Sequence, residues 1–278
     1  MRIDCKAIAA RIDKQRLKLI ENCTIDHPEL VVVHDDDPGS AIYRRMIVKD
    51  CDRLGVELTD IDVIKGPDEL NWRYNCGDFA KRPVLIQMPI KLPGYDRQWI
   101  ESHLNPSVDM DGIATLNAGH IYQGHLLDKT NTCTAAAVLQ AIYEAGRNYT
   151  QKADAGAFMT PGMRVLVIGR SNTVGRPIAA TMLRHDATVI VAHSKTPKDE
   201  IKWLCIWADV VVIAAPIDGW FDGFWFNERA IVIDVSESCG PDVADRVAYF
   251  VGNGNGIGPI TRSILMFRVF KYYADQTL

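Results

Sequence analysis

The sequence predicts an α/β protein of two lobes, the second of which contains a doubly wound parallel sheet. Short apolar runs, typical of buried strands, alternate with helix-like stretches along most of the chain, which is the pattern of a parallel sheet covered on both faces. In the second half the order is β-α-β-α-β-β, and a glycine-bearing turn joins the first strand to the first helix. A chain of 278 residues is long enough for two ordinary domains.

The first lobe is predicted over residues 1–150. Its strands and helices are expected at Leu30–Val33, Ser40–Leu54, Val84–Met88 and Thr134–Gly146. Ser40 is the expected N-cap of its first helix, and Gly55 is the expected C-terminal stop. A polar and Gly/Ala-rich stretch over residues 147–161 marks the lobe boundary.

The second lobe is predicted over residues 151–252 and leaves a C-terminal segment over residues 253–278. Its elements are expected as strands at Val165–Ile168, Ala187–Ala192, Asp209–Ala214 and Ala230–Val235, with a helix at Ile178–Leu183. This succession is typical of a Rossmann-like dinucleotide fold.

Composition excludes several classes of function. Hydrophobic residues make up 47% of the chain, charged residues 24%, and the net charge is −4, which argues against nucleic acid or an anionic membrane as a partner. No apolar run approaches the roughly 20 residues of a membrane span, and the charged N-terminus lacks a signal-peptide core, so a cytoplasmic location is expected. The seven cysteines are scattered without a CxxC pair, and no metal site is expected.

The turn from Gly169 to Gly175 is the main functional signal in the second lobe. A glycine at the strand exit lets the backbone turn tightly, and Gly175 lets the helix begin close to the sheet, where free N–H groups and the helix dipole favour an anion. Ser171 occupies the second glycine position of the usual GxGxxG fingerprint. Spacing alone therefore favours a nucleotide without establishing it.

The end of the next strand indicates which nucleotide. An NAD site normally has Asp or Glu there for the ribose 2′-hydroxyl, whereas this strand runs into His193-Ser194-Lys195. Arg170, Ser194 and Lys195 offer cationic and hydroxyl donors suited to a 2′-phosphate. An ordinary basic loop is the other interpretation, and NADP is favoured over NAD.

These segments resemble a known family. GRSNTVGRP and AHSKT, between Gly162 and Thr196, are similar to the cofactor lobe of the methylenetetrahydrofolate dehydrogenase/methenyltetrahydrofolate cyclohydrolase family. Five further motifs follow the family order, with DDPAS..Y, QLPL, DVDG, PCTP and GPMT matched by Asp36–Tyr43, Gln87–Ile90, Asp109–Gly112, Cys133-Thr134 and Gly258–Thr261. The resemblance covers nearly the whole chain.

The resemblance implies an activity and an architecture. It implies hydride transfer from 5,10-methylenetetrahydrofolate to NADP+, and in most members hydrolysis of the methenyl product to 10-formyltetrahydrofolate. It also implies tetrahydrofolate one-carbon derivatives as ligands, a cleft between an N-terminal folate lobe and the cofactor lobe, a C-terminal helix returning to the first lobe, and a homodimer.

The resemblance also assigns residues. Tyr43 matches the active-site tyrosine, whose ring can lie against the folate while its hydroxyl orients a proton donor or water; outside the motif it would be a half-buried helix tyrosine. Gln87 can hydrogen-bond polar groups at the reacting centre, and Asp111 can accept from pterin N–H groups or simply cap a turn. Gly258 and Pro259 complete the substrate-binding set. The expected cofactor-binding residues are Gly169, Arg170, Ser171, Val174, Gly175, Pro177, His193, Ser194 and Thr261.

The chain departs from the family at Ile47, four residues after Tyr43, where the family has its active-site lysine. Lys49 is two residues further on and, at about 100° per residue, faces roughly the opposite side of the helix. Hydrolysis needs an acid/base group, and Ile47 cannot ionise. Cyclohydrolase activity is therefore expected to be weak or lost.

Further departures concern the folate motifs and the end of the second lobe. Val108, Thr132 and Ala135 replace a lysine and two prolines of the family pattern. Glu237 places a carboxylate near the expected nicotinamide region, and a glycine-rich loop over residues 251–256 replaces a proline-rich one, so that it is expected to be more flexible.

Three functions stay open on the sequence. The first is an NADP-dependent dehydrogenase with weak or absent cyclohydrolase activity. The second is a bifunctional enzyme in which another group replaces the lysine. The third is a non-catalytic folate- or nucleotide-binding protein that regulates a partner.

Overall fold

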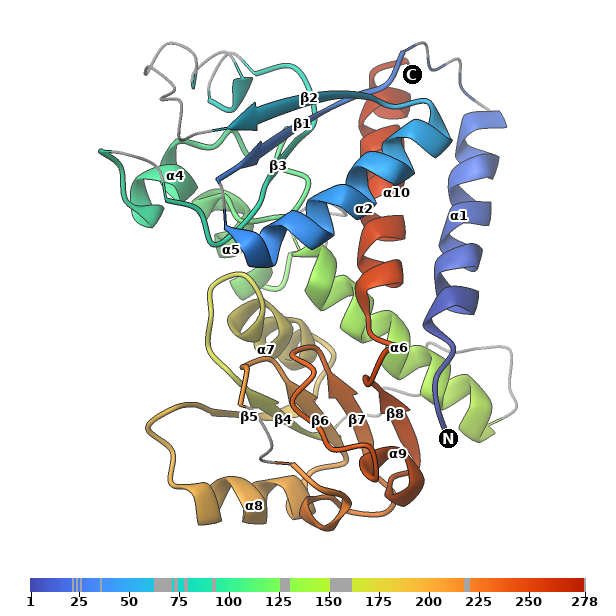
Figure 1. The fold of residues 1–278 in the computed structure, drawn as a ribbon, viewed down its shortest axis with the longest axis vertical. Helices are drawn as coiled ribbons and strands as arrows, with labels where there is room; N and C mark the ends of the chain where they lie inside the picture. Colours follow the sequence, from blue (N-terminus) through green and yellow to red (C-terminus); the bar gives the residue numbers. More distant parts are fainter. Residues whose placement is uncertain are drawn as a thin grey trace. The chain divides into compact units, whose positions relative to one another are not determined.

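The structure is a computed structural model that describes residues 1–278 except 22, 24, 26, 36, 63–71, 73–74, 78–79, 92–93, 126–130, 151–161, 218–220 and 278. Its residues fall into two compact units. Unit 1 comprises Met1–Ala10 and Thr134–Thr261, and unit 2 comprises Arg11–Cys133 and Arg262–Leu278. Each unit contains one parallel sheet (Figure 1). In the described part of the chain, no helix combines the length and the apolar character that crossing a membrane requires.

The sheet of unit 2 has three parallel strands in the order β2-β1-β3. They are β1 (Glu29–His34), β2 (Glu57–Asp62) and β3 (Val84–Ile86). The central strand is apolar from Leu30 to Val33 and buried through His34, as expected of a strand covered on both faces. The predicted strand at residues 84–88 is shorter than expected, since Gln87 and Met88 lie beyond its end.

Helix α2 (Pro38–Leu54) follows β1 and carries the first predicted site residue. Its N-cap is Asp37, whose carboxylate accepts the backbone N–H of Ser40 at 2.9 Å, so the prediction of Ser40 as the cap was wrong. Pro38 begins the helix, where its missing N–H costs nothing. Gly55 ends the helix with φ +68°, as predicted.

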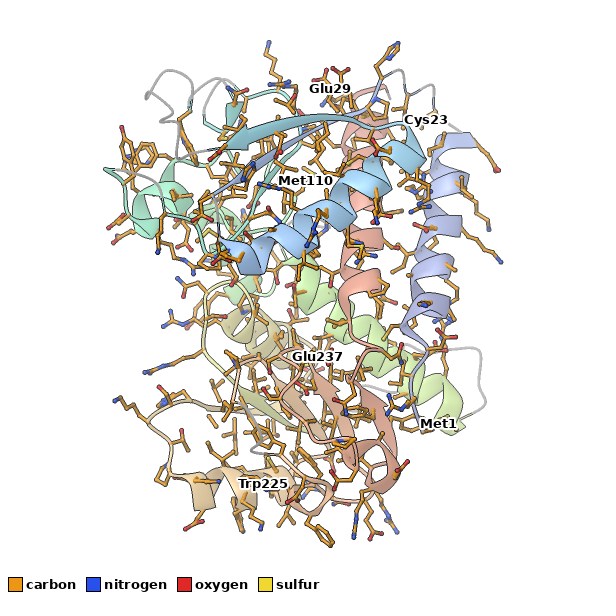
Figure 2. The ribbon with its side chains drawn as sticks, viewed as in Figure 1. Met1, Cys23, Glu29, Met110, Trp225 and Glu237 are labelled. Atoms are coloured by element: carbon orange, nitrogen blue, oxygen red, sulfur yellow. The ribbon has the colours of Figure 1, made fainter. Side chains whose placement is uncertain are left out.

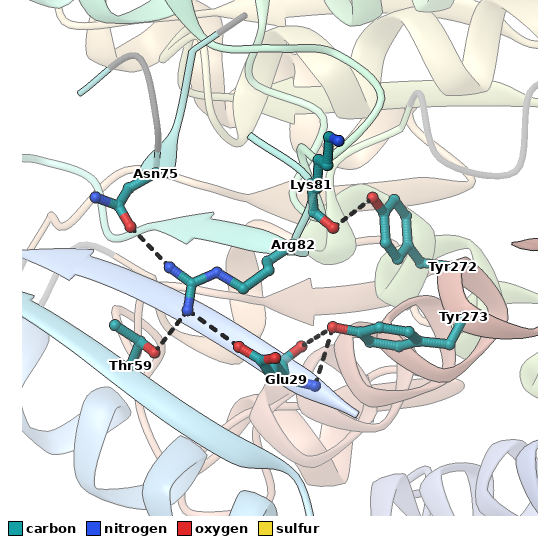
Figure 3. A network of polar contacts seen from close by, with 7 residues as sticks. All are labelled: Glu29, Thr59, Asn75, Lys81, Arg82, Tyr272 and Tyr273. Atoms are coloured by element: carbon teal, nitrogen blue, oxygen red, sulfur yellow. Dashed lines mark hydrogen bonds and ion pairs between the residues drawn. The ribbon is translucent and has the colours of Figure 1, made fainter. Parts of the chain in front are cut away.

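The remaining helices of unit 2 are α4 (Arg97–His103), α5 (Thr115–Tyr122) and most of α1 (Cys5–Glu21) and α10 (Gly258–Thr277). Helix α10 is fixed to the sheet at its C-terminal end (Figure 3). There the Tyr273 hydroxyl bonds the backbone N–H and C=O of Glu29, and the Tyr272 hydroxyl donates to the carbonyl of Lys81. Arg82 donates to Glu29 from the same network. The C-terminal helix thus belongs to the same compact unit as the N-terminal sheet.

The sheet of unit 1 has five parallel strands in the order β5-β4-β6-β7-β8. They are β4 (Arg164–Ile168), β5 (Thr188–Ala192), β6 (Val210–Ile213), β7 (Ile231–Asp234) and β8 (Tyr249–Val251). Helix α7 (Gly175–Arg184) packs on β4 and β5, and α8 (Lys198–Trp207), η3 (Gly223–Trp225) and α9 (Val243–Arg246) cover the other face (Figure 1). The doubly wound fold predicted for this part of the chain is confirmed.

The chain's first residues extend this sheet beyond β8. Ile3 donates its N–H to the carbonyl of Phe250, Phe250 donates to the carbonyl of Met1, and Arg2 pairs with Phe250 as an isolated parallel bridge. A protonated amino terminus donates to the carbonyl of Ala248 at 2.7 Å. Residues some 250 positions apart in sequence thus share one sheet edge, which no local pattern could indicate.

The unit boundaries differ from the predicted lobes. The predicted boundary after residue 150 adjoins residues 151–161, which lie outside the described residues, and the division by compactness falls instead between Cys133 and Thr134. Helix α6 (Cys133–Thr150) therefore groups with the five-stranded sheet after its first residue. Composition does not change along a continuous helix, so this boundary leaves no mark in the sequence.

Candidate functional site

The glycine turn of unit 1 packs the start of α7 tightly against the end of β4. Gly169 has φ +127°, and a Cβ there would lie 2.6 Å from the carbonyl oxygen of Ala214. A Cβ on Gly175 would lie 2.2 Å from the carbonyl oxygen of Gly169. Neither position tolerates a side chain, so both glycines are required by the backbone path. The helix N-terminus consequently lies at the carboxyl edge of the sheet, where its dipole favours an anion.

The other predicted residues of this turn have distinct local roles. The Oγ atom of Ser171 accepts the N–H groups of Val174 (3.2 Å) and Gly175 (3.4 Å), which holds the turn closed in place of a glycine. Arg170 is exposed, whereas Pro177 is buried in the first turn of α7. This close-packed cradle with an exposed cation fits a dinucleotide pyrophosphate.

We expect Gly175→Ala to abolish tight NADP+ binding and to lower the free energy of unfolding by about 1–3 kcal/mol, because the added methyl group forces α7 away from Gly169. Dye-detected binding and chemical denaturation measure the two effects. Gly119→Ala on α5 is the matched control, since a Cβ there meets nothing within 4 Å. Wild-type affinity and stability in Gly175→Ala would contradict the tight approach.

The end of β5 forms a compact turn that presents the predicted 2′-phosphate residues. The N–H of His193 donates to Thr196 Oγ1 (3.0 Å), and the N–H of Lys195 donates to His193 Nδ1 (3.2 Å). With Nδ1 acting as an acceptor, the neutral ring carries its proton on Nε2. Ser194 and Lys195 are exposed on this turn, and residues 193–196 include no acidic side chain.

The Gly258–Thr261 motif forms the first turn of α10. Gly258 and Pro259 are half-buried, while Thr261 is only 6% exposed and its hydroxyl donates to the carbonyl of Ile257 at 3.3 Å. All three belong to unit 1, together with the glycine turn. Their predicted roles in ligand binding stay predictions.

In unit 2, Tyr43 lies half-buried on α2 near several charged or polar groups. Burial raises the pKa of its hydroxyl well above the usual value, and the neighbouring Cys133 and Asp111 raise this pKa further. The hydroxyl therefore stays protonated at neutral pH and can donate a hydrogen bond. It is not suited to act as a base.

Gln87 follows β3 and is 5% exposed. Its Nε2 group donates to the carbonyl of Ser40 at 3.4 Å, but its Oε1 atom is buried with no partner among the described residues. An unpaired buried acceptor costs about 1–3 kcal/mol. A ligand donor would relieve this cost, which is the behaviour expected of a binding-site amide.

The two carboxylates of the Asp109–Gly112 motif divide their roles. Asp109 is 1% exposed and accepts the N–H groups of Gly112 and Ala114 and the side chain of Asn117; burial raises its pKa to about 6. Asp111 is half-buried and accepts the N–H of Cys133 at 2.8 Å. Asp109 thus holds the loop, while Asp111 is the carboxylate with exposed surface for a ligand.

Ile47 lies one helical turn after Tyr43 and is fully buried, with 0% of its surface exposed. Lys49 is exposed, as expected for a residue that faces another side of α2. The position one turn after Tyr43 is therefore occupied by a core side chain, and Lys49 lies on another side of the helix.

Sequence reasoning missed Arg268 of α10, which is 4% exposed. Its guanidinium donates to the carbonyls of Met110 (2.9 Å) and Asn131 (2.7 Å) and lies 3.5 Å from the Cys133 sulfur. It therefore ties together the residues that flank Asp111. The available signal was a single cation inside the apolar run from Ile264 to Phe270. No cluster of three or more metal-ligating side chains occurs among the described residues.

Comparison with known proteins adds a family and a fold. The model of the tetrahydrofolate dehydrogenase/cyclohydrolase NAD(P)-binding domain matches residues 132–277. Bifunctional protein FolD 2 of Myxococcus xanthus is 30% identical over 286 residues, covering 95% of this chain and 92% of the relative.

Solved structures share the fold at lower identity. The NADP-complexed methylenetetrahydrofolate dehydrogenase-cyclohydrolase of Trypanosoma brucei is 24% identical with a TM-score of 0.77, covering 99% of this chain and 97% of the other. The NAD-dependent methylenetetrahydrofolate dehydrogenase of Saccharomyces cerevisiae is 18% identical with a TM-score of 0.77 over the same shares. One fold therefore accommodates both cofactors, and individual residues must decide between them.

Proposed function

Because this chain belongs to the tetrahydrofolate dehydrogenase/cyclohydrolase family, we propose that it is an NADP-dependent 5,10-methylenetetrahydrofolate dehydrogenase of one-carbon metabolism with weak or absent cyclohydrolase activity. The observation that carries the proposal is the close-packed glycine turn from Gly169 to Gly175. The chain also has Tyr43, Gln87 and Asp111 at the positions of the family motifs. Bound NADP+ would supply the hydride acceptor.

The residues of unit 2 bind and orient the folate in this proposal. Asp111 accepts hydrogen bonds from N–H donors of the pterin, and the buried Gln87 oxygen accepts a further donor. The protonated Tyr43 hydroxyl donates a hydrogen bond or orders water. Hydride transfer depends on position more than on side-chain chemistry, so this set is sufficient for the dehydrogenase step.

Hydrolysis of the methenyl product requires a group that moves protons near neutral pH. The Tyr43 hydroxyl is held protonated, and burial raises the pKa of the Cys133 thiol as well, so that it is not a thiolate. Asp109, with a pKa of about 6, is occupied by its own loop. Ile47 offers no ionisable group. The absence of a suitable group among these residues supports the loss of the second activity.

The test follows the two steps separately. Purified protein is mixed with methylenetetrahydrofolate and NADP+, and methenyl formation is followed by its absorbance; decay of methenyltetrahydrofolate is then measured alone. Formation without accelerated decay is the expected result. Acceleration of both steps would indicate a bifunctional enzyme with a substitute group, and ligand binding without turnover would indicate a regulatory binding protein.

We expect Lys195→Ala to weaken NADP+ binding by about tenfold while changing NAD+ binding by less than about twofold, because a charge-assisted bond to the 2′-phosphate contributes roughly 1.5 kcal/mol. Lys198→Ala is the matched control, since Lys198 lies nearby over the ring of Trp225. Calorimetric affinities for both cofactors decide the question. Equal losses for NADP+ and NAD+ would contradict a 2′-phosphate contact.

The proposal includes a cytoplasmic homodimer. The family resemblance supports both the location and the assembly. Light scattering coupled to size-exclusion chromatography distinguishes a 31.0 kDa monomer from a dimer.

A further inference from the structure

The loop Gly252–Gly256 joins β8 to α10 in unit 1, and its neighbours fix it from several sides. The Asn255 side chain donates to the carbonyl of Ile3 at 2.5 Å, and the Asn253 side chain donates to the carbonyl of Gly240 at 3.1 Å. The loop was expected to be flexible because glycine replaces proline. These contacts restrain the two asparagine side chains, and the flexibility of the loop as a whole stays a prediction.

Glu237 approaches the same loop from the end of β7. Its Oε2 atom accepts the N–H of Gly254 at 3.4 Å, and its Oε1 atom lies 3.0 Å from the position that a Cβ on Gly256 would occupy. Figure 2 shows Glu237 at the edge of the sheet where the strands of unit 1 end. The carboxylate and the glycines of the loop are therefore complementary: Gly256 leaves the space that the carboxylate fills.

The backbone of Glu237 is unusual. Its φ is +57°, in the left-handed region that disfavours residues with a Cβ. Such a conformation persists where contacts with neighbouring residues offset its energetic cost, and it is found preferentially at functional sites. The neighbouring side chains supply that support, since the Ser236 and Ser238 hydroxyls bond to one another and Asp234 accepts from both the backbone N–H and the hydroxyl of Ser236.

We propose that Glu237 is a positioning residue that holds the loop Gly252–Gly256, and through it the Gly258–Thr261 turn, in the arrangement that binds the nicotinamide end of NADP+. Ligands of parallel sheets bind beyond the carboxyl ends of the strands, and both Glu237 and the loop follow such ends. Glycine-rich loops lose much conformational freedom when a ligand orders them. Ordering the loop beforehand removes that cost from cofactor binding. The proposal rests on the proposed function.

The test compares Glu237→Gly with Glu237→Gln in the full-length protein. Glycine relieves the left-handed backbone and removes the acceptor, whereas glutamine keeps an acceptor oxygen. In Glu237→Gly we expect an unchanged or higher Tm, amide exchange at Gly254 at least about tenfold faster, and a Kd for NADP+ at least about tenfold higher. The KM for NADP+ rises with little change in kcat. Glu237→Gln stays within about threefold of wild type in exchange and affinity.

A second variant approaches the contact from the other side. Gly256→Ala places a methyl group against the carboxylate, so we expect the same loss of affinity, and the double variant Glu237→Gly/Gly256→Ala should be no worse than either single change. If the wild type binds NADP+ but Glu237→Gly leaves the amide exchange of Gly254 or the affinity for NADP+ unchanged, the positioning role is overturned and the proposed function stands. A wild type that fails to bind NADP+ overturns the proposed function and the positioning role with it.

Discussion

Arg268→Met is expected to lower the free energy of unfolding by roughly 2–4 kcal/mol, because the buried carbonyl of Met110 loses its donor at about 1–3 kcal/mol and the partly buried carbonyl of Asn131 loses its donor at a smaller cost. It is also expected to weaken folate binding at neutral pH. Burial raises the pKa of Asp111, and the positive charge of Arg268 opposes that rise. Without the charge, the pKa of Asp111 moves higher and less of the carboxylate is ionised.

The pH dependence identifies which effect operates. Folate binding that needs ionised Asp111 is lost as the pH falls through its pKa, so the acid limb of the binding curve should move to higher pH in Arg268→Met. Arg268→Lys keeps the charge with fewer donors, and it should lose stability while keeping the wild-type limb. Binding of a folate analogue measured by calorimetry across pH separates the cases. An acid limb that stays in place in Arg268→Met would refute the electrostatic role.

The backbone geometry of the glycine turn from Gly169 to Gly175 was the part of the candidate site most completely predictable from the sequence. Gly169 and Gly175 are required by steric contacts a few residues long, and such local demands leave a spacing that can be recognised. The cap of α2 was assigned to Ser40 and not Asp37, although Pro38 at the first helical position indicated the earlier start. Local reasoning identified the helix and erred by its first turn.

Long-range contacts account for most of what the sequence did not show. Arg268 resembles a surface cation in an apolar helix until its two carbonyl partners, more than 130 residues away, are known. Glu237 was expected beside the nicotinamide, and only the structure shows its carboxylate on the N–H of Gly254. The restraint on the loop depends on Ile3 and Gly240, which are distant in sequence. Partners of this kind follow from the fold, and no motif encodes them.

Ile47→Lys is expected to increase methenyltetrahydrofolate hydrolysis at least about tenfold, which is below the roughly 10²–10⁴-fold contribution of a fully positioned general acid–base group. The site lies one turn after Tyr43 and is fully buried. Burial disfavours an ammonium, so the introduced lysine should have a pKa well below its usual value of about 10.4. A lysine that titrates closer to neutrality is better matched to proton transfer, and the hydrolysis rate should rise with pH as the neutral amine becomes available.

The same burial makes Ile47→Lys destabilising, so the control must be an uncharged substitution at the same position. Ile47→Lys should lose roughly 3 kcal/mol of unfolding free energy through an uncompensated buried charge, with the loss growing as the pH falls and the amine protonates. Ile47→Met changes shape without adding a charge and should keep stability within about 1.5 kcal/mol and show no gain in hydrolysis. If a folded Ile47→Lys protein also gains no hydrolysis, the lysine alone is insufficient. Thr132 and Ala135 then become the next candidates. They flank Cys133, whose N–H donates to Asp111. A gain in Ile47→Lys alone would show that one side chain separates this protein from a bifunctional enzyme.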